Sequence, residues 1–317
     1  MSLLSVIIPA YNEQESIPLI SQKVAEVLRA ENISYEIVFV NDGSKDQTAE
    51  EIKKAAQSDH KVRGINFSRN FGKEPAIFAG LQMAKGDCAV IIDSDLQHPP
   101  EIIPKMFRLW EGGYEIVEGI KSSRGKEGFL HRLMANTFYR IMSRMMKIDM
   151  ANTSDFKLID RRVIEILKTL TERNTFFRAL SFWTGFHTTS ISYEVQTREH
   201  GTSKWSVWGL VKYAINNVTS FSTVPLQMVT AMGIILIGGS ILLMIQTLYR
   251  FCTGTAVEGF TTVILLVLII GGFLMISLGI IGHYLARIYE EVKARPRYLI
   301  KDVINYGNED GHENINQ

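Results

Sequence analysis

The chain has 317 residues, of which 46% are hydrophobic and 21% are charged, and its 34 Lys and Arg residues balance 33 Asp and Glu residues to a net charge of +1. This length suffices for one large domain or two smaller ones. The neutral balance argues against a nucleic-acid binder that works by neutralising phosphates, and two cysteines exclude a disulfide scaffold. Between Tyr213 and Ala286 the only charged residues are Arg250 and Glu258. The composition therefore predicts a charged soluble domain joined to an apolar membrane domain.

The N-terminal part alternates β-branched runs with helical patterns. The expected strands cover residues 4–11, 35–42, 62–68 and 87–95. The expected helices cover residues 15–30, 46–58 and 73–84, the second of them capped by Ser44 or Asp46. Continuous apolar strands that alternate with helices indicate an α/β fold with a mostly parallel, Rossmann-like sheet covered on both faces.

Polar side chains follow each of the four expected strands. They are Tyr11, Asn12 and Glu13, then Asn41, Asp42 and Gly43, then Ser68, Arg69 and Asn70, then Asp93 and Asp95. Ligands bind parallel α/β sheets at the carboxyl ends of the strands. The polar residues at the ends of these four strands therefore predict one common binding site.

The residue pattern of this site argues against two common nucleotide-binding folds and favours a metal. No G-x-G-x-x-G follows the first strand and no G-x-x-x-x-G-K-[ST] occurs, so a dinucleotide oxidoreductase or a P-loop protein would lack its phosphate cradle. Asp93 and Asp95 instead follow an apolar strand directly. Two carboxylates in that position can hold a hard divalent cation together with pyrophosphate oxygens and water. A lone D-x-D is weak evidence and is also common in turns.

Two long apolar stretches, residues 224–249 and 259–286, each exceed the ~20 residues that a spanning helix needs. They predict a hairpin of two transmembrane helices; a buried helix pair in a globular core is the alternative. Lys204 and Lys212 precede the hairpin, and five basic residues follow it between Arg287 and Lys301. The positive-inside rule then places both termini in the cytoplasm. No signal peptide is expected, since the first apolar run is too short.

Two further segments have the pattern of interface helices. Residues 130–147 place apolar and basic side chains on opposite helical faces, which is typical of a helix on anionic lipid or of one packed on its own domain. Residues 205–222 begin with Trp205 and Trp208, which resemble an aromatic belt. The expected organisation is a cytoplasmic catalytic domain over residues 1–212, the hairpin over residues 224–286, and a cytoplasmic tail over residues 287–317.

Four spaced motifs carry a family resemblance. They are PAYNE at Pro9–Glu13, NDGS at Asn41–Ser44, DSDLQHPPE at Asp93–Glu101 and REHGTSKW at Arg198–Trp205. With them the chain resembles family-2 glycosyltransferases of the GT-A fold, and more closely the membrane-anchored polyprenyl-phosphate glycosyltransferases, over about residues 3–300. The resemblance implies a nucleotide-sugar donor (a UDP-sugar favoured), Mg²⁺ or Mn²⁺, a polyprenyl-phosphate acceptor in a lipid bilayer, and assembly as a homo-oligomer. No nucleic acid is expected as a partner.

The same resemblance assigns binding roles to matching positions. The residues expected around the nucleoside are Pro9, Tyr11, Glu13, Val40 and Asp42. Those expected along the diphosphate are Asp93, Ser94 and Asp95, and the expected metal ligands are Asp95 and Gln97 with help from Asp93. Further positive charge for the diphosphate and the acceptor phosphate is expected from Lys121 or Arg124 and from Arg198 with Lys204. Contact with solvent or anionic lipid is the alternative for these four cations.

Asp155 matches the acidic residue that such enzymes place near the acceptor, where general base is the usual assignment. A phosphate monoester has a second pKa near 6, so the acceptor is already mostly dianionic at neutral pH. We therefore expect Asp155 to orient the acceptor or the sugar, with proton removal secondary. Capping of the following helix is the structural alternative. His98 and His131 have no partner at metal-ligand spacing and are interpreted as satisfied polar residues.

These observations favour an inverting, metal-dependent glycosyltransferase that moves a sugar to polyprenyl phosphate at the cytoplasmic membrane face. UDP-glucose and UDP-N-acetylglucosamine are the favoured donors, ahead of GDP-mannose. A processive polysaccharide synthase is one alternative, although the chain lacks the Q-x-x-R-W pattern and has only two expected spans. A non-catalytic membrane module that binds nucleotide sugar is the other, although its metal carboxylates would then have no role.

Overall fold

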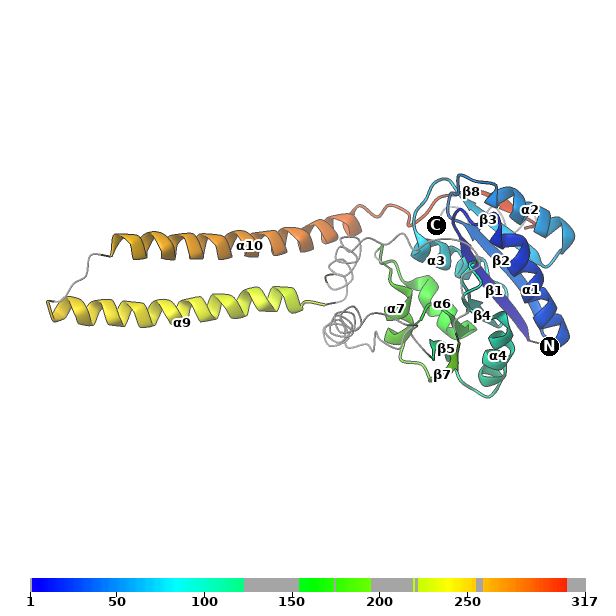
Figure 1. Cartoon of the computed structure of the whole chain (residues 1–317), viewed down its shortest axis with the longest axis horizontal. Helices are drawn as coiled ribbons and strands as arrows, with labels where there is room; N and C mark the ends of the chain where they lie inside the picture. The colour runs from blue at the N-terminus through cyan, green and yellow to red at the C-terminus, as the bar shows by residue number, and fades with distance from the viewer. Residues whose placement is uncertain are drawn as a thin grey trace. The chain divides into compact units, whose positions relative to one another are not determined.

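The computed structural model describes residues 2–122, 154–173, 175–194, 219, 222–254 and 259–306. The chain divides into two compact units (Figure 1). One unit comprises Met1–Trp205 and Arg295–Gln317, and the other comprises Ser206–Ala294. The expected interface helices at 130–147 and 205–222 lie outside the described residues, apart from 219 and 222.

The described part of the larger unit contains eight strands and the helices between them. The strands are β1 (Leu3–Ala10), β2 (Ser34–Asn41), β3 (Val62–Phe67), β4 (Cys88–Ile91), β5 (Ile116–Lys121), β6 (Lys157–Asp160), β7 (Thr188–Tyr193) and β8 (Ile300–Ile304). The helices are α1 (Ser16–Ala30), α2 (Thr48–Ser58), α3 (Lys73–Met83), the 3₁₀ turn η1 (Pro100–Ile102), α4 (Ile103–Glu111), α6 (Arg161–Thr169) and α7 (Phe177–Trp183).

The strands form one mixed sheet in the order β7-β5-β6-β4-β1-β2-β3-β8. The central strands β4, β1, β2 and β3 are parallel, with Val6 opposite Ile37 and Val90. β7 is parallel to β5, whereas β6 and β8 run antiparallel to their neighbours. The prediction of an α/β fold with a mostly parallel sheet is confirmed.

Helices cover both faces of the sheet (Figure 1). On one face, buried side chains of β1 and β2 pack against Ile20 of α1, Ile52 of α2 and Met106 of α4. On the other face, Val38 and Ile65 pack against Ala76 and Ala79 of α3. Because alternate residues of a strand point to opposite faces, strands buried on both sides must be apolar throughout. This requirement explains the unbroken apolar runs in the sequence.

The observed elements differ from the expected ones mainly at their ends. The fourth strand ends at Ile91, so Asp93 and Asp95 lie in the loop beyond it. The expected cap of α2 at Ser44 or Asp46 is wrong, because the helix begins at Thr48 with Gln47 in the cap position. Asp46 instead accepts hydrogen bonds from the backbone N–H and the hydroxyl of Thr48.

The segment beyond the second apolar helix returns to the sheet. The sequence predicts a tail over residues 287–317, but residues 300–304 form β8, which pairs with β3 from Gly64 to Phe67. Tyr298 stacks on Phe67 with ring centroids 5.0 Å apart, and the guanidinium of Arg297 lies over the ring of Phe78. The sheet therefore contains strands from both sides of the apolar helices in the sequence.

The smaller unit contains the two long apolar helices α9 (Val224–Cys252) and α10 (Phe260–Val292). Their candidate membrane spans, Val224–Arg250 and Thr262–Val292, have mean hydropathies of 2.4 and 2.9. Both helices are long and apolar enough to cross a membrane. At one end of the pair, the hydroxyl of Tyr284 donates a 2.5 Å hydrogen bond to the carbonyl of Ser222.

Candidate functional site

A cavity of about 300 Å³ opens at the carboxyl ends of β1, β2 and β4. It is lined by Pro9, Ala10, Tyr11, Glu13, Asp42, Asn70, Gly72, Lys73, Ala76, Asp93, Ser94 and Asp95. For seven of these residues the sequence motifs predict contact with the nucleotide sugar. The structure thus brings most of the described candidate residues into one cavity, as expected for ligand sites of open α/β sheets.

The loops after β1 and β2 bind each other and form one wall of this region. The backbone N–H of Asn12 donates to the hydroxyl of Ser44, and its side-chain oxygen accepts from the backbone N–H of Lys45, each at 2.9 Å. The backbone N–H of Glu13 donates to the Thr48 hydroxyl at 2.9 Å. These hydrogen bonds hold the PAYNE and NDGS motifs against each other. Local sequence patterns do not predict this contact between the two loops.

Asp42 is buried and fastens the loop after β3. Its two carboxylate oxygens accept backbone N–H bonds from Phe71 at 2.6 Å and from Gly72 at 2.9 Å. Burial raises the pKa of this carboxyl, although the two hydrogen bonds act against that shift. The next residue, Gly43, has a φ of +63°, and a β-carbon there would lie 2.2 Å from the carbonyl carbon of Arg69. Only glycine permits this close approach of the two loops.

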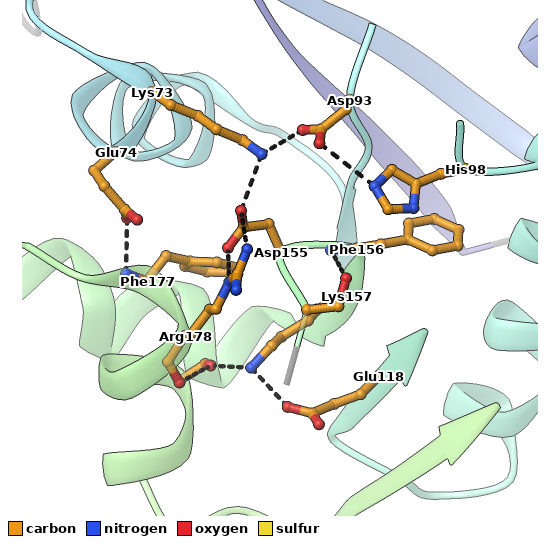
Figure 2. A network of polar contacts seen from close by, with 12 residues as sticks. Lys73, Glu74, Asp93, His98, Glu118, Asp155, Phe156, Lys157, Phe177 and Arg178 are labelled. Atoms are coloured by element: carbon orange, nitrogen blue, oxygen red, sulfur yellow. Dashed lines mark hydrogen bonds and ion pairs between the residues drawn. The ribbon is translucent and has the colours of Figure 1, made fainter. Parts of the chain in front are cut away.

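Lys73, the first residue of α3, joins Asp93 to Asp155 (Figure 2). Its ammonium lies 2.5 Å from Oδ1 of Asp93 and 2.9 Å from Oδ2 of Asp155. Burial alone would lower the pKa of Lys73, but the charges of Asp93 and Asp155 outweigh it and hold that pKa above its usual range. Lys73 is therefore held in its protonated, positively charged form between two carboxylates.

Asp155 also accepts a two-pronged contact from Arg178 of α7 (Figure 2). Nε of Arg178 lies 2.6 Å from Oδ1, and an Nη nitrogen lies 2.9 Å from Oδ2. Burial would raise the pKa of Asp155, but Lys73 and Arg178 together hold it well below its usual range. These two cations thus favour the ionised form of Asp155. The capping alternative is wrong, because Asp160 caps α6 by accepting from the backbone N–H of Arg162.

Two further charged groups hold α7 in place. Glu74 accepts a 2.8 Å hydrogen bond from the backbone N–H of Phe177, and burial together with the charge of Asp155 raises its pKa to about 7. Lys157, fully buried on β6, donates to the Ser181 hydroxyl at 2.7 Å and lies 2.6 Å from Glu118 of β5. Burial lowers the pKa of Lys157. These contacts fix the helix that carries Arg178.

His98 has the polar partners expected for it. Its Nδ1 lies 2.5 Å from the Tyr193 hydroxyl, and its Nε2 lies 3.4 Å from Oδ2 of Asp93. The imidazole also packs against Phe156, with ring centroids 5.0 Å apart. The ring is buried, so it supports Asp93 from the side away from Lys73.

Among the candidates that the structure describes, Val40, Gln97 and Lys121 do not line the cavity. Val40 is buried in the core, where it packs with Ile65. Lys121 is exposed at the end of β5. Gln97 donates its backbone N–H to Oδ1 of Asp95 at 3.1 Å. Three more candidates, Arg124, Arg198 and Lys204, lie outside the described residues.

The donor groups at the cavity fit a metal that is shared with a ligand. Within the described residues no group of three or more His, Cys, Asp or Glu could hold a metal ion by itself. Asp93 and Asp95 supply two carboxylates to one wall, which leaves other coordination positions to phosphate oxygens and water. Mg²⁺ is typically bound in this way, by one or two carboxylates plus substrate phosphates.

Comparison with known proteins decides the family. Residues 5–167 match the model of "Glycosyl transferase family 2", which covers the strands and loops that form this cavity. The chain belongs to this family. It is 39% identical to an uncharacterized glycosyltransferase of Synechocystis over 95% of both chains. It is 40% identical to a prophage-derived bactoprenol glucosyl transferase of Shigella flexneri, over 94% of this chain and 97% of that one.

A further relative of this family 2 glycosyltransferase is the prophage bactoprenol glucosyl transferase homolog of Escherichia coli, which is 38% identical over 95% of this chain and 99% of that one. Among solved structures, glucosyl-3-phosphoglycerate synthase from Mycobacterium tuberculosis in complex with Mn²⁺, UDP-glucose and phosphoglyceric acid is 17% identical. It covers 69% of this chain and 78% of that one, with a TM-score of 0.48. The resemblance stated from the sequence motifs is confirmed at the level of the family.

Two groups of the glycosyltransferase site were not predicted. Lys73 had a detectable signal, since it begins the expected helix directly after a strand end and the first turn of such a helix lies at the ligand edge of the sheet. Arg178 had none. It reaches Asp155 only because α7 packs beside β6, and nothing in its sequence surroundings marks it.

Proposed function

We propose that the chain is an inverting glycosyltransferase that transfers glucose from UDP-glucose to polyprenyl phosphate at the cytoplasmic face of a membrane, with N-acetylglucosamine as the second candidate sugar. One observation carries the proposal. The cavity brings the nucleotide-side residues Tyr11 and Asp42 and the carboxylates Asp93 and Asp95 to one sheet edge, and Asp93 is joined through Lys73 to the acceptor-side Asp155. In the proposal, the donor-side and acceptor-side residues are therefore connected through the ammonium of Lys73 in the free protein.

The choice of sugar and acceptor is supported by the relatives. Several proteins that are 40% identical over 94% of this chain are named bactoprenol glucosyl transferase. The match extends over the soluble unit and the apolar helices alike. Because an acceptor with a polyprenyl tail stays in the bilayer, a chain with two candidate spans can hold its catalytic site near the acceptor phosphate.

In the proposed reaction an oxygen of the acceptor phosphate attacks the anomeric carbon of the sugar, and the nucleoside diphosphate leaves from the opposite face. One displacement inverts the configuration at that carbon. A phosphate monoester with a second pKa near 6 needs no base at neutral pH. Asp155 is a poor base, because Lys73 and Arg178 hold its pKa below its usual range. Its role in the proposal is to orient the acceptor or the sugar.

Asp93 and Asp95, with Gln97, would hold Mg²⁺ or Mn²⁺, which neutralises the charge that develops on the leaving diphosphate. Asp42 fixes the loop that carries Asn70 and Gly72 to the cavity wall. The hydrogen bonds of Glu74 and Lys157 to α7 hold this helix in position. In that position two guanidinium nitrogens of Arg178 donate to Asp155. These residues restrict the site to one geometry before substrates bind.

The same proposal includes a membrane topology of two spans with both ends of the hairpin in the cytoplasm. β8 supports it, since this strand follows α10 in the sequence and pairs in the same sheet as strands that precede α9. A chain that leaves and rejoins one folded sheet must cross the bilayer an even number of times. By the positive-inside rule, the basic residues around the hairpin favour the cytoplasm for that side.

The direct test incubates the purified full-length protein in detergent with labelled UDP-glucose, a short-chain polyprenyl phosphate and Mn²⁺, and measures lipid-extractable label. UDP-N-acetylglucosamine and GDP-mannose serve as competing donors, and Asp95→Asn serves as the matched inactive variant. We expect label from UDP-glucose that disappears with EDTA and returns with Mn²⁺ or Mg²⁺. Absence of lipid label from every donor would overturn the proposal.

Two other outcomes identify the alternatives. Label in a polymer that elongates with time, instead of a lipid bearing one sugar, indicates a processive synthase. Binding of UDP-glucose without any product indicates a non-catalytic module.

A further inference from the structure

The contacts of Asp93 differ from those of Asp155 in a way that bears on metal binding. Oδ1 of Asp93 lies 2.5 Å from the ammonium of Lys73, and Oδ2 lies 3.4 Å from Nε2 of His98. Among the residues that the structure describes, Lys73 supplies the only full positive charge within ion-pair distance of Asp93. Both oxygens of this carboxylate therefore already have partners in the protein alone.

Asp155, in contrast, has two cationic partners. Arg178 contacts both of its oxygens, and Lys73 adds a third contact at 2.9 Å. If Lys73 were released from one carboxylate, Asp93 would lose its only full countercharge, whereas Asp155 would keep a bidentate arginine. Bidentate arginine–carboxylate pairs are among the strongest charge-assisted contacts in proteins.

The geometry of Lys73 allows such a release. Its side chain is 40% exposed and lines the cavity, whereas the Asp155 side chain is only 10% exposed. A lysine ammonium is a compact charge on a flexible four-carbon stem, so it can give up one oxygen while it keeps the other. A divalent cation that approaches Asp93 and Asp95 from the cavity would meet this ammonium.

We propose that Lys73 is an exchangeable internal cation of this site: it occupies Asp93 in the free protein, yields Asp93 to the divalent metal that enters with the donor, and stays paired with Asp155. The inference rests on the proposed function for the identity of the metal-bearing substrate. Two carboxylates a few ångströms apart repel each other strongly in a partly buried site. Lys73 keeps Asp93 and Asp155 correctly placed before the metal arrives, at the cost of competing with it.

If Lys73 competes with the metal for Asp93, its removal should raise the metal affinity, which removal of a purely structural lysine would not do. Removal of Lys73 should strengthen metal binding to the free protein and weaken catalysis, because Asp93 becomes available while Asp155 loses a partner. The test measures Mn²⁺ binding to the full-length protein in detergent, without donor, from the electron paramagnetic resonance signal of free Mn²⁺. The variants are Lys73→Met, Lys73→Gln and Lys73→Arg, with Lys53→Met on the exposed face of α2 as a matched control for the lost charge.

We expect Lys73→Met and Lys73→Gln to bind Mn²⁺ about tenfold more tightly than the unmodified protein, a change within the usual range of coupling between neighbouring groups. Lys73→Arg and Lys53→Met should stay within about twofold. In an Asp93→Asn background, the effect of Lys73→Met should shrink to less than about threefold, since its target is gone.

Unchanged or weaker Mn²⁺ binding in both neutral Lys73 variants would overturn the inference, and so would an equal gain in Lys53→Met. A failure of the proposed function is recognised separately, because it appears as absence of lipid label in the transfer assay of the unmodified protein. A protein that transfers sugar and binds Mn²⁺, but whose Lys73 variants bind it no better, contradicts only the exchange.

Discussion

Asn66 on β3 donates a 2.5 Å side-chain hydrogen bond to Asp302 on β8, across 236 residues of sequence. The side-chain oxygen of Asn66 accepts in turn from Asn41 at 2.9 Å, and Asn41 immediately precedes Asp42 of the cavity. The segment that follows the second apolar helix is thereby connected, through two hydrogen bonds, to the loop expected to hold the nucleoside. The C-terminal segment belongs to the structural support of the site.

Asp302→Ala tests this connection. The substitution removes a charge-assisted hydrogen bond and should lower the free energy of unfolding of the larger unit by about 1–2 kcal/mol. It should also weaken UDP binding, since Asn66 would no longer be held against Asn41. Thermal unfolding and UDP titration of the full-length protein measure both effects. The neighbouring exposed Lys301→Ala is the control, and an equal loss in both variants would show that the Asn66–Asp302 bond has no special role.

Arg178 should be essential for catalysis without contacting the nucleotide. Arg178→Met removes both contacts to Asp155, and we expect kcat to fall about 100-fold, as misplacement of a catalytic group typically does. Arg178→Lys should recover little activity, because an ammonium cannot reproduce the fork that binds both oxygens. The affinity for UDP should change less than threefold. Rescue by lysine to near-normal turnover would contradict the bidentate role.

Asp155→Asn separates an orienting role from a general base. Because the pKa of Asp155 is held below its usual range, this carboxyl is ionised throughout the neutral range. The activity of the variant should therefore fall by a similar factor at about pH 6 and about pH 8, with a pH profile parallel to that of the unmodified enzyme. Initial rates with saturating UDP-glucose measure this. Loss at pH 6 with steep recovery at pH 8 would indicate that Asp155 removes a proton.

Glu74 should make the stability depend on pH in the opposite direction to an ordinary ion-paired carboxylate. Its pKa rises from 4.5 to about 7 on folding, so the stability that its protonated form contributes is fully present below 4.5 and is lost as the pH rises through about 7. Glu74→Gln keeps an oxygen that can accept from the backbone N–H of Phe177. We expect equal thermal midpoints at about pH 4 and a higher midpoint for the variant at about pH 8.5.

The control for this measurement is Glu50→Gln on the exposed side of α2, which should shift the midpoint equally at both pH values. A Glu74→Gln midpoint that tracks the unmodified protein across this pH range would show that Glu74 stays ionised in the folded state.

The two cysteines offer a test of the membrane topology. Cys88 is buried in β4, whereas Cys252 is exposed at the end of α9. A membrane-impermeant maleimide added to intact cells should label Cys252 only, because the hairpin turn is proposed to face the outside. Cys252→Ser should abolish the labelling. Labelling that requires permeabilised cells would place the turn inside and contradict the proposed orientation of the hairpin.

Local sequence patterns determined the order of the strands and helices in the larger unit. Continuous apolar runs such as residues 6–8 and 37–40 are typical of strands buried on both faces of a parallel sheet, so they indicated the α/β fold and the edge where ligands bind. The cavity residues were predicted from the D-x-D, PAYNE and NDGS motifs, because each motif follows a strand and the carboxyl ends of parallel strands lie at one edge of the sheet. The two apolar helices followed from length and composition alone.

Tertiary structure decided the contacts between residues far apart in sequence. Three such contacts depend on how separate elements pack, and no local periodicity encodes that packing. They are the pairing of β8 with β3, the bidentate hydrogen bonds of Arg178 to Asp155, and the ion pairs of Lys73 with Asp93 and Asp155. The protonation of Asp155 illustrates the difference. The sequence determined that a carboxyl stands there, but only its two cationic neighbours in space decide that it remains ionised, because a pKa depends on the charges and burial around the group.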